Sequence, residues 1–349
     1  MNTHQQTGDT WLSPVQSLAH KLNLDSPWVK HKLDFVMPMG VTIIRELLLA
    51  LALLFGVSLV VFTILYAAPG DSFSLLLSGE RSASATEEVA QSLGFSNSWF
   101  GQYSTWLINI LHGDLGTSIR TGQSVFENVV SATINTLNLT LAAMLVTLII
   151  AYPIAIYTSV RSATPLNGPL TIFAYVISAL PLFWLAYIGI FVSTNVFDYF
   201  PLGIGLGVED DMEIMQFLLP VLILGIGSGT VSEVVRFLKL EISRVLEEEY
   251  IRTAKAKGAS IWRHGFKEGL LLPTSQIISS KIPFFLGGAI IVEQVFNWPG
   301  MGRMAWQAAQ DRDFPVIMGI ALAAAILVRL GSLVHRMIYI IVNPRASHE

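Results

Sequence analysis

Apolar runs long enough to cross a lipid bilayer recur along this chain, and they constrain its fold more than any other feature. A helix needs about 20 mainly apolar residues to span the hydrocarbon core. Only 13% of the residues are charged, whereas soluble domains are roughly one quarter charged. The mean hydropathy is +0.58. The sequence therefore predicts an all-α polytopic membrane protein.

We expect six transmembrane helices, which cover approximately residues 43–67, 136–157, 170–196, 217–237, 277–295 and 314–341. Several of these runs contain prolines or glycines: Pro153, Pro181, Gly225, Gly227, Gly229, Pro283, Gly287 and Gly288. Such residues are tolerated where neighbouring helices or water satisfy the backbone, and small residues let helices approach closely. They fit either a packed bundle or a transport path.

The basic residues predict the orientation of the spans. Cytoplasmic segments of membrane proteins carry an excess of lysine and arginine. With the N-terminus inside, all but four of the 21 basic residues lie on the cytoplasmic side; the exceptions are Arg81, Arg120, Arg303 and Arg312. Both termini are therefore predicted to be cytoplasmic. The opposite side is rich in acidic residues, which fits either a basic partner surface or topology alone.

The spans divide the chain into a transmembrane domain and flanking segments. We expect a polar N-terminal tail at 1–40, a transmembrane domain at 41–345 and a C-terminal tail at 346–349, with an extracytoplasmic segment at 68–135 and a cytoplasmic loop at 238–273. No signal peptide is expected before Val41. An apolar face from Trp11 to Leu22 allows an interfacial helix or a solvated tail. Further helices are expected at about Thr86–Leu93 and Trp99–Leu111.

A charged segment, Glu247–Pro273, separates the fourth and fifth apolar runs. Glutamates at its start and Lys255 and Lys257 further on suit the dipole of a first helix. Gly258 is a good C-terminal cap for that helix, and Ser260 can cap a second helix that ends at Pro273. The sequence predicts a helix–turn–helix that projects from the membrane.

Helical spacing places Tyr250, Ile251, Ala254 and Lys257 on one face of the first helix. Ala254 and Ala256 keep part of its surface slim, so that another protein can approach closely. The alternative is a solvated loop whose charges only set the topology.

The segment Glu249-Tyr250-Ile251-Arg252-Thr253-Ala254-Lys255-Ala256-Lys257-Gly258 resembles the cytoplasmic loop of the permease subunits in dipeptide, oligopeptide and nickel ABC importers. Four more stretches resemble that family, in the expected order: Leu65–Asp71, Gly113–Ser118, Glu293–Gly302 and Asn343–Arg345. The resemblance covers about residues 41–345. The chain departs from the family in its long N-terminal tail, a shorter loop after Gly258, Asn135-Thr136 in place of a proline, and Asn343 in place of an aspartate.

The resemblance implies a type I ABC importer permease fold in a bacterial inner membrane. It implies four kinds of partner: membrane lipid, a second homologous permease, an extracytoplasmic solute-binding protein and two cytoplasmic ATPase subunits, which hold ATP and Mg. The loop residues Glu249–Gly258 would contact an ATPase. Peptides, nickel chelates and oligosaccharides are carried by such systems, and the cargo stays open. No nucleic-acid partner is expected.

The chain is not expected to be an enzyme or to hold a cofactor or metal. It lacks the Gly-x-x-x-x-Gly-Lys-Ser/Thr sequence that cradles nucleotide phosphates, and it has no cysteine. Six ionisable residues lie within the apolar runs, mostly near their ends: Glu233, Arg236, Lys281, Glu293, Arg329 and His335. We interpret them as side chains that reach the membrane surface and assign none to the substrate.

Three other functions are less consistent with the sequence. A secondary transporter would need paired broken spans, and the charged insert would be unexplained. In an intramembrane serine protease Ser228 and His335 would be the catalytic pair, but the glycines do not form the motif expected around the serine, and His335 lies at the cytoplasmic margin. A non-transporting scaffold does not explain the collinear motifs.

Overall fold

The computed structural model describes residues 27–67, 99–160, 181–196, 210–227, 229–260 and 267–342, with Gly265 and a few positions between 168 and 180. These residues form helices α2 (Pro27–Ala67), α5 (Trp99–Leu111), α6 (Val125–Val160), α8 (Leu182–Val196), α9 (Asp210–Ile226), α10 (Thr230–Glu247), α11 (Glu249–Ala256), the π-helical turn η1 (Lys267–Leu271), α13 (Leu272–Val295), α14 (Met301–Asp311) and α15 (Phe314–Val342). The predicted all-α fold is confirmed for this part of the chain.

Some predicted features lie outside the described residues. They are the helices at Trp11–Leu22 and Thr86–Leu93, the motifs Ala68–Asp71 and Asn343–Arg345, Ser228, and the tail at 346–349. The predicted helix Trp99–Leu111 is confirmed as α5.

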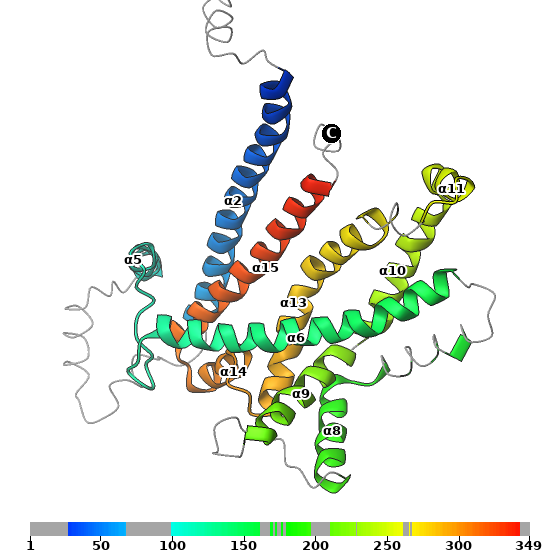
Figure 1. The fold of residues 1–349 in the computed structure, drawn as a ribbon. Coiled ribbons are helices and arrows are strands. Elements are labelled where there is room, and N and C mark those ends of the chain that lie inside the picture. Colours follow the sequence, from blue (N-terminus) through cyan, green and yellow to red (C-terminus); the bar gives the residue numbers. More distant parts are fainter. Residues whose placement is uncertain are drawn as a thin grey trace, which may run out of the picture.

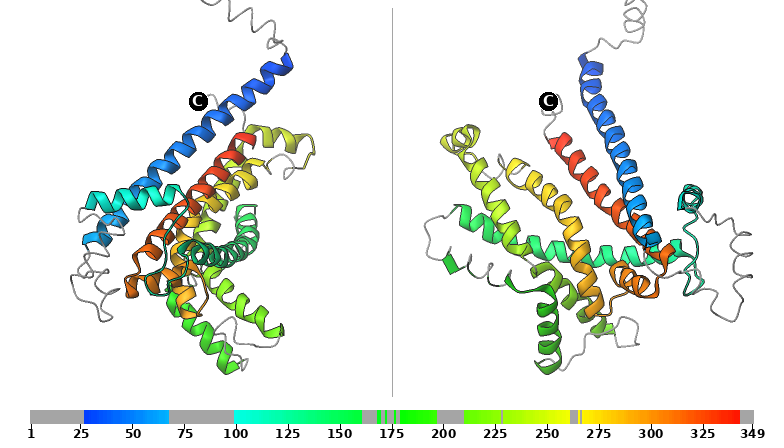
Figure 2. Two further views of the ribbon diagram at one scale, coloured as in Figure 1. Left: turned by 90° about the vertical axis from the view of Figure 1, so that its left-hand side faces the viewer. Right: turned by 180° about the vertical axis from the view of Figure 1, so that it is seen from behind.

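The helices form a bundle in which α6 crosses the others (Figure 1). Helix α15 packs between α2 and α13, while α6 packs against α10 and α9. The start of α2, the end of α15 and the short helix α11 lie at one end of the molecule, and α14 lies toward the other (Figures 1 and 2). The loops that connect the candidate spans therefore lie at opposite ends of the molecule, with α11 at one end and α14 at the other.

Four helical stretches are long and apolar enough to cross a membrane: Ile43–Ala67, Val125–Val160, Gly269–Val295 and Phe314–Ile341. The pair α9 and α10 adds a fifth candidate if it counts as one bent span. The expected third span is represented only by α8, whose 15 residues are too few to cross alone. The described residues thus support four or five of the six expected spans.

The expected fourth span is not one continuous helix. Helices α9 and α10 meet at an angle of 54°. Gly229 precedes α10 with φ of +82°, a left-handed conformation that glycine adopts without steric cost. Nearby, Gly225 allows a close approach to α6, because a Cβ there would lie 2.6 Å from the Ala143 carbonyl oxygen. The Thr147 hydroxyl of α6 donates a hydrogen bond to the Gly225 carbonyl at 2.6 Å. Gly225 therefore serves helix packing.

Two other predicted boundaries are wrong. Helix α6 starts at Val125, well before the predicted residue 136, because Glu127, Asn128 and Asn135 make this part of the helix too polar for a hydropathy criterion. The second loop helix does not end at Pro273, because η1 runs directly into α13. Pro273 lies in the first turn of α13, where a missing N–H removes no α-helical bond.

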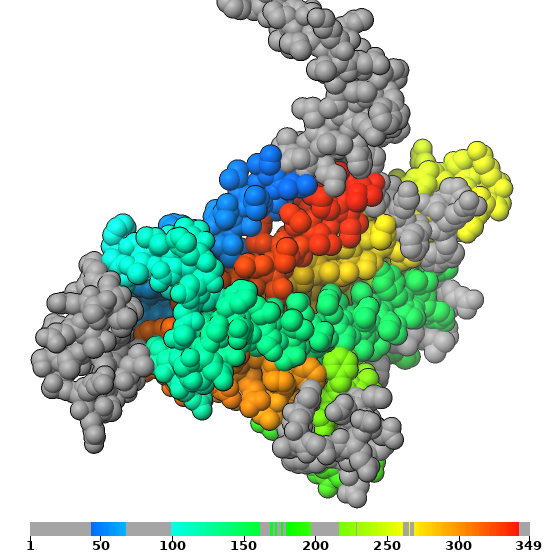
Figure 3. All heavy atoms as spheres, turned by 60° about the vertical axis from the view of Figure 1, so that its left-hand side comes forward, coloured from blue at the N-terminus to red at the C-terminus, as the bar shows by residue number. Residues whose placement is uncertain are grey.

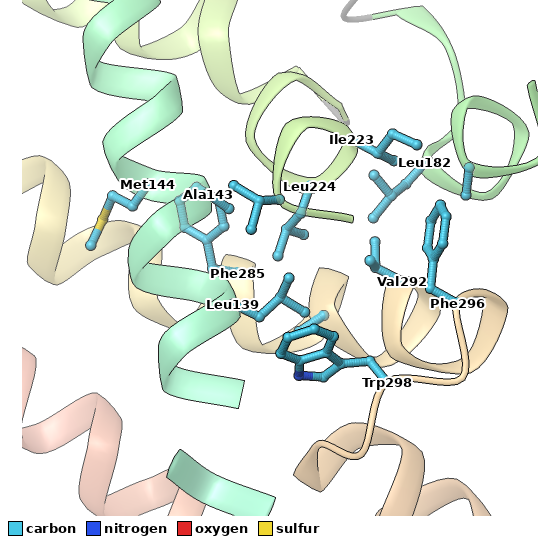
Figure 4. Packing of buried hydrophobic residues seen from close by; sticks show 13 residues of the cluster. Leu139, Ala143, Met144, Leu182, Ile223, Leu224, Phe285, Val292, Phe296 and Trp298 are labelled. Atoms are coloured by element: carbon cyan, nitrogen blue, oxygen red, sulfur yellow. The ribbon is translucent and has the colours of Figure 1, made fainter. Parts of the chain in front are cut away.

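The main apolar core joins α6, α8, α9, α13 and the turn after α13 (Figure 4). Leu139, Leu224, Phe285 and Val292 point into it and are at most 2% exposed. Trp298 closes the cluster at the end of α13 and packs at a ring distance of 5.6 Å from Phe217. The end of α13 is therefore fixed against α6 and α9.

Helix α2 is joined to α15 by ion pairs. Glu46 is only 5% exposed; its carboxylate accepts a hydrogen bond from Arg329 at 2.5 Å and forms a second ion pair with Arg336 at 3.0 Å. An inaccessible carboxylate between two guanidinium groups is stabilised by its partners. The interpretation of Arg329 as a side chain that reaches the membrane surface is therefore wrong, because it bonds to α2.

Candidate functional site

The predicted helix of the charged loop is α11, which stands out from the bundle at one edge of the molecule (yellow in Figure 3). Only Ile251, with 0% exposure, and Ala254, with 4%, are buried in it. Tyr250 and Lys257, which helical spacing places on the same face as these two residues, are exposed. Of the two alanines that were expected to allow another protein to approach closely, only Ala256 lies on the exposed surface of α11.

Ile251 rests on a small apolar floor. This floor is formed by Ile242, Val245, Leu246, Gly265, Gly269 and Leu270. A Cβ at Gly265 would lie 3.3 Å from Val245 and 3.5 Å from Ile251, so the absence of a side chain permits close packing there. The floor belongs to α10 and to the segment that leads into α13. Helix α11 is thereby packed against two elements that enter the membrane bundle.

The end of α11 is a Schellman motif centred on Gly258. The Gly258 N–H donates to the Lys255 carbonyl at 3.0 Å, and the Ala259 N–H donates to the Ala254 carbonyl at 2.9 Å. Gly258 has φ of +69°, as this motif requires. Its predicted role as the terminating glycine is confirmed.

A single extended residue, Glu248, separates α10 from α11. The Glu248 carbonyl accepts the N–H groups of Ile251 and Arg252, both at 3.1 Å, and so starts the new helix. Exposed glutamates lie at this end of α11, and the exposed Lys255 and Lys257 lie at the other. The helix offers a short bipolar surface, about 12 Å long for eight residues. Such a surface can bind a complementary groove; among the described residues no cluster of His, Asp or Glu could hold a metal ion.

A second polar constellation lies at the other end of the bundle, where the motif Glu293–Gly302 joins α13 to α14. Glu293 is fully buried, so the interpretation that it reaches the membrane surface is wrong. Its carboxylate accepts the Thr136 hydroxyl at 2.6 Å and the N–H groups of Gly302 and Arg303, the latter at 2.9 Å. Thr136 in turn accepts the Met301 N–H at 2.8 Å. Glu293 and Thr136 together cap the N-terminus of α14.

The rest of that turn binds α6 through the backbone. The Trp298 indole N–H donates to the Asn135 carbonyl at 3.2 Å, and the Asn135 side chain donates to the Pro299 carbonyl at 2.9 Å. Gly300 has no room for a side chain, because a Cβ there would overlap the Glu293 carboxylate. The motif is therefore a packing device, with Gly300 adjoining the buried acid.

Helix α14 and the capping role of Glu293 were not predicted from the sequence. The signal for α14 was present, since Met301, Met304, Ala305 and Ala308 recur at helical spacing and pack into a core with α6 and α15. The role of Glu293 depends on Thr136, which is far away in the sequence, and no local pattern indicates it.

The predicted extracytoplasmic motif Gly113–Ser118 is a turn that packs against the start of α15. Gly113 and Gly116 have φ of +82° and +80°. The Ser118 hydroxyl donates to Asp313 at 2.5 Å, and the Ile119 N–H donates to the same carboxylate at 3.2 Å. This motif, α14 and the Glu293 turn thus form one connected structure.

The apolar helical bundle, with a short, exposed helix at one end, places the chain in the class of polytopic membrane proteins. Residues 151–348 match the family described as the binding-protein-dependent transport system inner membrane component. Residues 39–140 match the N-terminal region of membrane components of such systems. The chain belongs to this family.

Curated relatives match nearly the whole chain. The oligopeptide transport system permease protein AppB of Bacillus subtilis is 35% identical over 321 residues, which cover 89% of this chain and 100% of the relative. The glutathione transport system permease protein GsiC of Escherichia coli O6:H1 is 32% identical, covering 88% and 99%. The dipeptide transport system permease protein DppB of Alkalihalophilus pseudofirmus is 29% identical, covering 87% and 98%.

Family membership confirms several predictions. The chain is a non-catalytic permease component of an ABC importer, and it is an inner-membrane protein. A binding-protein-dependent system implies a solute-binding protein and an ATPase as partners. The secondary transporter, the protease and the scaffold are not supported.

Proposed function

We propose that this chain is one of two homologous permease subunits in an ATP-driven importer of peptides, and that α11 docks on one of two cytoplasmic ATPase subunits. The cargo is proposed because the relatives are named for oligopeptide, dipeptide and glutathione transport. The proposed docking residues are Glu249, Tyr250, Ile251, Arg252, Thr253, Ala254, Lys255, Ala256, Lys257 and Gly258. Among them Ile251 and Ala254 act from the buried side, by holding α11 in place.

One observation carries the proposal: α11 packs on α10 and on the segment entering α13 at the same time. A displacement of α11 by an ATPase would therefore move two membrane helices together. Nucleotide-driven closure can shift the bundle only if the ATPase contacts α11 differently in its open and closed states.

The proposed topology has six spans and cytoplasmic termini, with the domain at 41–345, the outer segment at 68–135 and the coupling loop at 238–273. The excess of basic residues supports it, and so does the location of α11, the start of α2 and the end of α15 at one end of the molecule. The connected structure of α14 and the Glu293 turn would then face the solute-binding protein.

Cross-linking tests the docking directly, because the chain has no cysteine of its own. We expect single cysteines at the exposed Arg252 and Lys255 to cross-link to the ATPase in vesicles that import a labelled oligopeptide. A cysteine at exposed Gln310 of α14, at the opposite end, is the matched control and should not react. If neither site on α11 captured the ATPase while import continued, the docking assignment would be wrong. If the complex imported no peptide, the proposed cargo would be wrong.

Replacing Gly258 with valine should lower the peptide imported per ATP hydrolysed several-fold. A left-handed residue other than glycine costs about 1–2 kcal/mol, and β-branching adds to it. The folding of the bundle should not change, because a Cβ at Gly258 would meet nothing within 4 Å. Gly258→Asn is the control, since asparagine tolerates this conformation and should retain most of the coupling. Uptake and ATPase assays on reconstituted complexes measure both, and equal coupling in the two variants would contradict this role.

A further inference from the structure

An ion pair joins α10 and α13 within the membrane domain. Lys281 lies near the middle of the 27-residue candidate span Gly269–Val295, and its ammonium group bonds to the carboxylate of Glu233. The Lys281 side chain is 11% exposed and that of Glu233 is 52% exposed. The ammonium group also lies 5.3 Å from the centre of the Phe284 ring, a favourable cation–π distance. The carboxylate is therefore the more accessible member of the pair.

The surface around this pair differs from a lipid-facing surface. The exposed side chains of α2 are almost all large and apolar, as at Leu48, Leu51 and Ile64. The exposed face of α13 instead mixes Phe284 and Ile291 with polar and small residues. These are Gln276, Ser280, Gly287 and Gln294.

Helix α10 adds charge to the same region. Arg236 is exposed one turn after Glu233. Lipid tails offer charged and amide groups no hydrogen bonds, so intramembrane ionisable residues face a bundle interior or a water-filled cavity. An exposed carboxylate beside an exposed guanidinium therefore indicates a surface that meets water within the assembled transporter.

We propose that Glu233 and Lys281 form a polar binding site in the translocation pathway. This site binds the charged ends of a zwitterionic peptide. The α-ammonium of the peptide bonds to Glu233, and its carboxylate bonds to Lys281, with Arg236 as a second cation. This inference rests on the proposed function, peptide import, and specifies how the pathway recognises its cargo.

The pairing in the empty protein suits transient binding. Without cargo, each charge has its partner, so no uncompensated charge stays buried. A zwitterion replaces one ion pair with two, and when it leaves, the Glu233–Lys281 pair reforms. The loss of that pair offsets part of the gain on binding, which keeps the cargo from being held too tightly to pass.

Thiol labelling tests whether the region meets water. Ser280 is exposed and next to Lys281, and Ser280→Cys changes a single atom in a chain without other cysteines. In the assembled complex we expect this cysteine to react with a water-soluble thiol reagent at least about tenfold faster than Leu51→Cys on the apolar face of α2. Equal, slow labelling would mean that the face is buried or contacts lipid, and would overturn the proposal.

Transport selectivity tests the binding role. The double variant Glu233→Gln/Lys281→Met removes both charges without leaving either unpaired. Uptake is measured for a labelled tripeptide and for its N-acetylated, C-amidated form, presented at equal occupancy of the solute-binding protein. We expect the double variant to lower uptake of the zwitterion about tenfold relative to uptake of the blocked peptide. Leu51→Ala should leave that ratio unchanged.

The two proposals fail in different ways. If wild-type complex imports neither peptide, peptide import itself is wrong. If wild type imports the zwitterion but the double variant lowers both peptides equally, or lowers neither, the pair only joins α10 to α13. The recognition role is then overturned, while peptide import stands.

Discussion

Glu293→Ala is expected to destabilise the permease by about 3–5 kcal/mol, because three donors lose their acceptor together. A buried donor left without a partner costs about 1–3 kcal/mol. The Thr136 hydroxyl and the N–H groups of Gly302 and Arg303 all bond to this fully buried carboxylate. The start of α14 should lose its cap, and the turn should separate from α6. The midpoint of thermal unfolding of the purified complex, together with proteolysis within α14, measures the effect.

Two variants isolate the capping role. Glu293→Gln retains an acceptor oxygen and nearly the same volume but loses the charge, so it should cost about half as much. Gln294→Ala alters the exposed neighbour and should leave the midpoint nearly unchanged. If Glu293→Ala were as stable as Gln294→Ala, the bonds at this carboxylate would not hold the turn together.

Local signals in the sequence were sufficient for the short helix α11, whereas α14 was not predicted. The limits of α11 follow from glutamates at its start and from Gly258, and both signals act within a few residues of the helix end. Helix α5 was predicted because the segment between the first two spans is too long for a simple turn. The apolar runs located the long spans because hydropathy depends on composition alone.

Features that depend on contacts between distant elements could not be predicted. The early start of α6 is concealed by polar residues before Thr136, among them Asn135, which is unsuited to a span by hydropathy but bonds to the turn after α13. The bend between α9 and α10 needs the left-handed Gly229, and single glycines also occur in straight helices. Arg329 gave no sign of bonding to Glu46, which lies in another span. In each case the feature depends on a distant partner or on a backbone conformation that sequence periodicity does not identify.

At the candidate docking site, too, local features were predicted from the sequence, whereas contacts with distant elements were not. The sequence placed α11 and its terminating glycine correctly but assigned Ala254 to the docking surface. Helical spacing groups residues onto one face, yet it does not say whether that face meets a partner or the chain's own core. The floor of α10 and the segment before α13 decides this, and it buries Ile251 and Ala254.

Removal of the Ile251 side chain should therefore melt α11 while the membrane bundle stays folded. Isolated helices shorter than about 12–15 residues are marginal in water, and α11 has eight residues, of which two are buried. Replacing a buried isoleucine with alanine costs about 2–5 kcal/mol, and replacing it with valine about 0.5–1.5 kcal/mol. We expect a graded loss of coupling, small for Ile251→Val, large for Ile251→Ala and nearly complete for Ile251→Asp, which would bury a charge.

Hydrogen exchange of the amides in residues 249–258 measures the folding of α11, and peptide imported per ATP hydrolysed measures its consequence. Lys255→Ala separates the two, because this exposed lysine can contribute to docking without holding α11 in place. That variant should keep amide protection and lose only part of the coupling. Ile251→Ala should lose both together, since a docking surface that is not folded cannot transmit a displacement. Normal protection of 249–258 in Ile251→Ala would mean that contacts other than this side chain hold α11 on the bundle.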